Sequence, residues 1–158
     1  MKNLKSFLFN LTTALLGIFT LIFLSQAYIQ GAYGTGYVNA YEMIDFSSNE
    51  GRVVMTALSM LMIIIFVSLL VLLALVNILK DFNVFKSSKN FGKIMSMIEV
   101  ILTGIILGFS IVGMCCLISL TNDMGGLASV GWALILNTIF AAAMFVVSIF
   151  KILTVKKK

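Results

Sequence analysis

The chain has 158 residues, of which 61% are hydrophobic and only 11% charged, and its mean hydropathy is +1.12. Soluble domains contain about 45–50% apolar and about 25% charged residues, so this composition excludes a soluble fold and indicates a membrane protein. The net charge of +5 does not indicate nucleic-acid binding, because the lysines cluster at the ends of apolar runs instead of covering a face with interleaved aromatic residues.

The first apolar run covers residues 6–29 and follows a short basic leader that holds Lys2 and Lys5. A charged start, an apolar stretch and the small residues Ser25 and Ala27 would also fit a cleaved signal peptide. The apolar core of a signal peptide is about 7–15 residues long, whereas this run reaches the roughly 20 residues of a membrane span. We therefore expect an uncleaved first transmembrane helix.

Residues 30–52 form a long polar connection. Tyr33, Tyr37 and Tyr41 recur every four residues, which is typical of an aromatic belt at a membrane surface, and three acidic residues follow them. We expect an outer loop with at most one short amphipathic turn, at residues 37–46.

Three further apolar runs complete a set of four predicted spans in one domain, residues 1–158, and they lie at residues 53–79, 94–120 and 127–150. The connection at residues 80–93 is basic, and the one at residues 121–126 is a tight turn with two glycines. A turn this short makes the third and fourth helices antiparallel neighbours. The sequence thus predicts an all-α membrane protein, folded as an antiparallel four-helix transmembrane bundle.

The basic residues are unevenly distributed along the chain. Ten of the eleven lie in the N-terminal leader, in the 80–93 connection and in the C-terminal segment, whereas the other two connections hold Arg52 alone with four of the six acids. Short connections rich in lysine and arginine favour the cytoplasmic side of a membrane. We therefore expect a multi-pass protein of the plasma membrane with both termini and the 80–93 loop in the cytoplasm (N-in/C-in).

Small and polar residues recur at i, i+4 and i+7 spacing on the first, third and fourth predicted helices. Such a stripe lets membrane helices approach closely, and its hydroxyl and amide groups can bond across the contact. The second helix has only a weak version of the stripe, so we expect it to be the most exposed to lipid. The candidate polar seam of the bundle comprises Asn10, Thr13, Glu99, Thr103, Asn137, Ser148 and Lys151.

Glu99 is an acidic residue inside an apolar run. At 1.5 Å per residue it lies about 12 Å to the cytoplasmic side of its helix midpoint, inside a hydrocarbon half-thickness of about 15 Å. Asn10 falls at about this depth, Ser148 slightly further out, and Asn77 and Lys151 near the interface. This predicts a polar cluster at the cytoplasmic end of the bundle, with Lys151 as the ionic partner of Glu99. The carboxyl could instead reach water or stay protonated. Asn137, about 3 Å from its helix midpoint, is the deepest strongly polar group.

Gly104 and Gly108 form a candidate helix-packing face on the third span. At 100° per residue they point roughly 120–180° away from Glu99. Glycines at this spacing allow close helix contact. Two interpretations stay open: the face docks a second copy or another membrane protein, or it packs against a helix of the same chain.

The sequence does not predict an enzyme. The chain has no histidine, its two cysteines are adjacent, and no two acids share the membrane interior, so proteolytic, haem and thiol-redox chemistry lack their residues. We expect no catalytic residue, metal or cofactor. Our leading hypothesis is a small non-enzymatic membrane protein, an accessory, interaction or protective subunit that works through helix contacts and its outer loop. The alternative is a small oligomeric transporter or channel that uses the seam around Glu99 and Asn137.

Overall fold

The computed structural model describes residues 4–31, 37–44, 46–82, 84, 91–125 and 127–155. Its elements, in chain order, are α1 (Leu4–Phe23), β1 (Ala27–Gly31), β2 (Tyr37–Asn39), α2 (Gly51–Asp81), α3 (Phe91–Asp123), β3 (Ala128–Val130) and α4 (Trp132–Val155). In the described part of the chain, four helices are long and apolar enough to cross a membrane, which indicates a multi-pass membrane protein.

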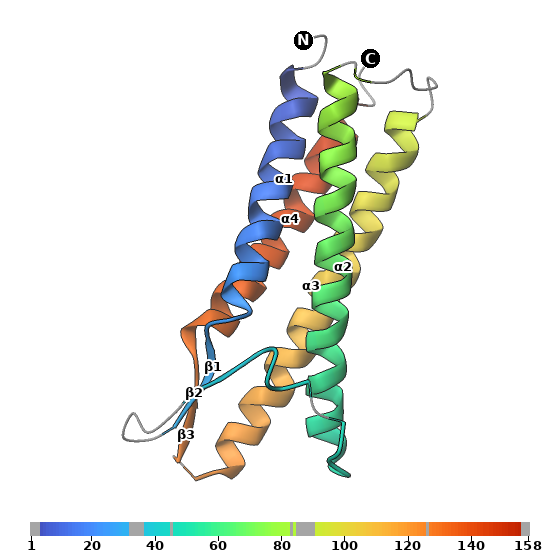
Figure 1. Ribbon diagram of the computed structural model, residues 1–158. Coiled ribbons are helices and arrows are strands. Elements are labelled where there is room, and N and C mark those ends of the chain that lie inside the picture. Colours follow the sequence, from blue (N-terminus) through green and yellow to red (C-terminus); the bar gives the residue numbers. More distant parts are fainter. Residues whose placement is uncertain are drawn as a thin grey trace.

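The helices form one bundle in which each packs against the next in sequence, and α4 closes the ring by packing against α1. The beginning of α1 and the end of α4 lie at one end of the bundle, and the three strands lie at the other (Figure 1). Aromatic rings join neighbouring helices: Phe23 of α1 meets Trp132 of α4, and Phe66 of α2 stacks on Phe109 of α3.

Each helix turns one narrow stripe of side chains inward, at the three- and four-residue spacing of a helical face. The stripe of α2 is mostly aliphatic, and the expectation that α2 is the most lipid-exposed helix is wrong. In windows of equal length, 33% of the α2 residues are buried, against 28% in α1 and in α3. Small and polar residues are thus not required for burial, because aliphatic side chains fill the bundle interior equally well.

An apolar layer crosses the middle of the bundle. Val67 of α2, Ile106 of α3 and Met144 of α4 have no exposed surface, and each lies within about 2 Å of its helix midpoint at 1.5 Å per residue. Leu70 and Ala141 extend the layer and are equally buried. We call these five residues the apolar layer.

The first helix ends earlier than predicted. Residues 6–29 were expected to be one span, but α1 ends at Phe23 and Ala27–Gly31 forms β1. Helical spacing continues only to Leu24, whose amide still bonds to the Thr20 carbonyl. The β-branched and aromatic residues that follow pair with other strands, which outweighs the apolar character that suggested a longer helix.

The first and third connections form an antiparallel three-stranded sheet in the order β2-β1-β3, so the bundle is helical but the chain is not entirely α. Ile29 of β1 stands opposite Val38 on one side and Val130 on the other. Residues 37–39 are therefore a strand, and the turn expected at residues 37–46 is limited to residues 40–43, where the amide of Met43 donates to the Asn39 carbonyl over 3.2 Å. The fourth helix begins at Trp132 and not at residue 127, because residues 128–130 belong to β3.

At Gly17, α1 packs closely against α2. A Cβ atom there would lie 2.6 Å from Cγ2 of Val71, a stiff β-branched side chain, whereas a Cβ at Gly108 would meet nothing within 4 Å.

Gly17→Ala should therefore lower the free energy of unfolding by about 1–3 kcal/mol through overpacking. Gly108→Ala is the matched control and should cause no loss. Thermal unfolding followed by circular dichroism in detergent measures both, and equal stability of the two variants would contradict this packing.

Candidate functional site

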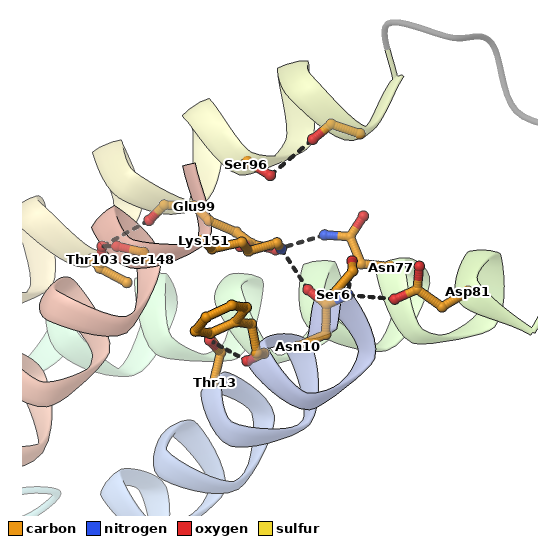
Figure 2. A network of polar contacts seen from close by, with 12 residues as sticks. Ser6, Asn10, Thr13, Asn77, Asp81, Ser96, Glu99, Thr103, Ser148 and Lys151 are labelled. Carbon is orange, nitrogen blue, oxygen red and sulfur yellow. Dashed lines mark hydrogen bonds and ion pairs between the residues drawn. The ribbon is translucent and has the colours of Figure 1, made fainter. Parts of the chain in front are cut away.

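An ion pair lies inside the bundle between α3 and α4. The Nζ atom of Lys151 donates to Oε2 of Glu99 over 2.5 Å, and the side chains are 4% and 0% exposed. Glu99 lies about two turns from the start of α3, and Lys151 lies about one turn from the end of α4. The two helix ends lie at the same end of the bundle, so these positions bring the charges together (Figure 2).

The other two helices each add an asparagine to this pair. The Nδ2 atom of Asn77, on α2, donates to Oε1 of Glu99 over 2.6 Å. Lys151 donates a second hydrogen bond, of 2.5 Å, to Oδ1 of Asn10 on α1. Both carboxylate oxygens of Glu99 therefore have a donor, and all four helices meet at one ion pair.

The contacts continue from Asn10 toward the end of the bundle. Its Nδ2 atom donates to Oδ2 of Asp81 over 2.9 Å and lies 3.5 Å from Oγ of Ser6. Asp81 is the last residue of α2 and is only partly buried. The five linked residues are named the polar network from here on: Asn10, Asn77, Asp81, Glu99 and Lys151.

Three residues of the predicted seam lie beside the polar network without bonding to its side chains. The hydroxyls of Thr103 and Ser148 are 2.9 Å apart and join α3 to α4, and Thr103 also donates to the carbonyl of Glu99 over 2.8 Å. Thr13 is buried but donates to the carbonyl of Phe9 on its own helix, over 3.0 Å. The hydroxyls of the seam thus donate hydrogen bonds to backbone carbonyls of their own helix, as is common for serine and threonine in helices.

Asn137 lies far from the polar network. Because α4 begins at Trp132, Asn137 is about 10 Å from the helix midpoint, on the sheet side, and not the 3 Å expected from the sequence. Its distance from Lys151 along the helix is about 21 Å. Its amide bonds to the hydroxyl of Tyr28 on β1, so it joins the sheet to α4 and not two helices. Among the described residues, its Oδ1 atom is the buried side-chain polar atom left without a partner.

Tyr28 holds the sheet against the bundle. Its side chain is buried, and the amide of Gly131, just before α4, donates to its backbone carbonyl over 2.7 Å. Burial raises the pKa of the Tyr28 phenol above its ordinary value, so the hydroxyl stays protonated over the physiological range. Sequence reasoning assigned Tyr28 to the first span and gave it no role.

A second ionic contact lies at the sheet end of the bundle. Arg52, at the start of α2, contacts Glu50 over 2.7 Å and also pairs with Asp123 at the end of α3. It donates a further bond of 3.0 Å to Ser119. These side chains are largely exposed, so the contact is worth little compared with a buried one.

The sequence reasoning missed two members of the polar network. It placed Asn77 near the interface without a partner and counted Asp81 only as an acid in a basic connection. The signal was present: Asn77 and Asp81 are four residues apart, so they lie on the same face of α2 as the buried Ala74.

The structure separates the two glycines of the candidate packing face. A Cβ atom at Gly104 would contact the Phe145 ring of α4 at 3.4 Å, so this glycine serves packing within the chain. Gly108 is exposed, with open space around it. Packing within the chain therefore accounts for Gly104, and docking through Gly108 stays a prediction.

The chain matches no protein-family model, and neither a curated protein nor a solved structure shows significant similarity to it.

The buried ion pair allows a double-mutant test. Glu99→Met or Lys151→Met leaves one buried charge without its partner, which costs about 3–5 kcal/mol of unfolding free energy, whereas the double substitution removes both charges and should recover most of that loss. Unfolding in detergent measures the three variants.

Asp123→Asn provides the exposed control, because it removes one acid from Arg52 and should change stability by no more than about 1 kcal/mol. Additive losses in the Glu99 and Lys151 double variant would show that the two side chains do not act as a pair.

Proposed function

We propose that this protein is a non-enzymatic integral membrane subunit, with an accessory, interaction or protective role exerted through helix contacts and its outer connection. In this proposal the helices form an antiparallel bundle in the plasma membrane, and both termini lie in the cytoplasm.

The apolar layer is the observation that carries this proposal. It lies between the polar network at one end and the Tyr28–Asn137 contact at the other, and its five side chains have no exposed surface. A polar pathway through the chain would need polar groups or water at this depth. Val67, Ile106 and Met144 fill that position with hydrocarbon, so the predicted seam is interrupted in its middle.

The bonding of the polar network supports the same proposal. Glu99 is fully buried and its carboxylate is held by a lysine and an asparagine of the same chain. A carboxylate held in this way is not presented to a substrate or an ion. Its direct effect is to join helices, as buried polar groups do in other membrane bundles.

The distribution of charge supports the orientation. Lys80 and Lys93 lie at the polar-network end, where α2 ends and α3 begins. The acids Glu42, Glu50 and Asp123 lie near the sheet end. Lysine-rich connections favour the cytoplasmic side, so the sheet is assigned to the outer face.

Flux measurements test the proposal against the transporter alternative. Wild-type protein in proteoliposomes should pass protons, sodium and potassium no faster than empty vesicles, because the apolar layer blocks the interior. Glu99→Gln should leave this background unchanged. Ion-selective fluorescent dyes inside the vesicles measure each flux, and a wild-type flux that Glu99→Gln abolishes in folded protein would favour a transporter.

Assembly should depend on Gly108. Gly108→Leu fills an exposed gap on α3 without touching another helix of the chain, so it should weaken self-association or partner binding while monomer stability is kept. Ile101→Leu, on an exposed position of the same helix, changes shape but fills no gap and serves as the control. Crosslinking in native membranes measures assembly. An identical crosslinking pattern for wild type and Gly108→Leu would exclude this face.

A further inference from the structure

We infer that the polar-network end of the bundle binds the headgroups of anionic phospholipids through Lys5, Lys80 and Lys93. This inference requires only that the bundle spans a bilayer, and it does not depend on the accessory role proposed above.

The charges at this end are not balanced within the chain. Among the described residues, Lys5, Lys80, Lys93 and Lys151 lie on the helix turns at this end, and the acids there are Asp81 and Glu99. Glu99 is buried against Lys151, and Asp81 accepts a hydrogen bond from Asn10. Among the described residues, Lys5, Lys80 and Lys93 form no ion pair with an acid.

The geometry brings two of these lysines to one corner of the bundle. The Nζ atom of Lys80, at the end of α2, lies 4.9 Å from the centroid of the Phe91 ring at the start of α3. The same atom would be 2.8 Å from a Cβ on Gly92, so the absent side chain of this glycine leaves room for the ammonium. Lys93 follows Gly92 directly and is exposed.

The start of α1 lies beside this corner. The Phe7 ring of α1 meets the Phe82 ring, just after α2, edge to face at 5.5 Å. Lys5 is exposed two residues before Phe7. Three ammonium groups from three helices therefore share one end of the bundle.

The position of these lysines favours a lipid over a soluble anion. Each has an exposed aliphatic neighbour in sequence: Leu4 beside Lys5, Leu79 beside Lys80 and Ile94 beside Lys93. Aliphatic side chains that face outward from a membrane helix contact acyl chains, and a lysine next to them extends its ammonium to the level of the lipid phosphates. A ligand with a phosphate and an attached acyl chain fits both features. A net negative headgroup fits better than a zwitterionic one, whose choline is repelled.

Native mass spectrometry tests the inference with the full chain released from nanodiscs of equal phosphatidylglycerol and phosphatidylcholine. Wild-type protein should retain mainly phosphatidylglycerol. The double variant Lys80→Gln/Lys93→Gln should lose this preference by about 30-fold, since each lysine near an anionic membrane surface contributes about fivefold. Lys80→Arg/Lys93→Arg should restore the preference.

Arg52→Gln removes an equal charge from the sheet end and should leave the phosphatidylglycerol preference unchanged. Circular dichroism of each variant establishes that it is folded before lipids are counted. Equal retention of the two lipids by wild-type protein overturns the inference, as does full retention of phosphatidylglycerol by the glutamine variant. Displacement of the bound lipid by a short RNA would assign the lysines to nucleic acid instead and would also overturn it.

Discussion

The ion pair between Glu99 and Lys151 is the interaction on which the arrangement of the four helices depends. Removing two charges from water costs several kcal/mol for each ion, and attraction offsets this cost only when the geometry is good and the remaining polar atoms are bonded. Here Asn77 and Asn10 supply those bonds. Because each residue of a helix turns by 100°, rotating any one helix by a single residue would separate its group from the rest. The pair therefore fixes how all four helices face one another.

The two ends of the bundle are held by different kinds of contact, with hydrocarbon between them. At one end four helices share a charged network. At the other, the exposed ion pair of Arg52 with Asp123 joins α2 to α3, and the buried Tyr28–Asn137 contact joins α4 to the sheet. The middle relies on close packing of Val67, Ile106 and Met144, which is non-directional and tolerates exchange among residues of similar volume. The directional contacts at the two ends thus fix the orientation of the helices. The apolar layer between them excludes water from the bundle interior.

Sequence spacing and depth predicted the contact of Lys151 with Glu99, because a helix has a fixed rise and rotation per residue. They did not predict the sheet, since the pairing of Ile29 with Val130 joins residues on opposite sides of two long helices. Because β3 was not predicted, the fourth helix was expected to begin at residue 127, five residues before its actual start at Trp132. The depth of Asn137 was therefore measured from the wrong midpoint. Asn77 was missed as a partner of Glu99, because the spacing that puts it on the inward face of α2 does not say which helix lies opposite. Local periodicity identifies which face is buried, whereas the partners of a polar group depend on contacts between distant segments.

The polar network also has an order of assembly. Glu99 precedes Lys151 by 52 residues, and Asn10 precedes it by 141. The ribosome therefore completes three of the helices before the ammonium that bonds to two of them exists. During this interval Asn77 can bond to Glu99, but the second carboxylate oxygen and the carbonyl of Asn10 still lack their donor. Synthesis of the last two turns of α4 supplies it. The network that joins all four helices is consequently incomplete until α4 has been synthesised as far as Lys151.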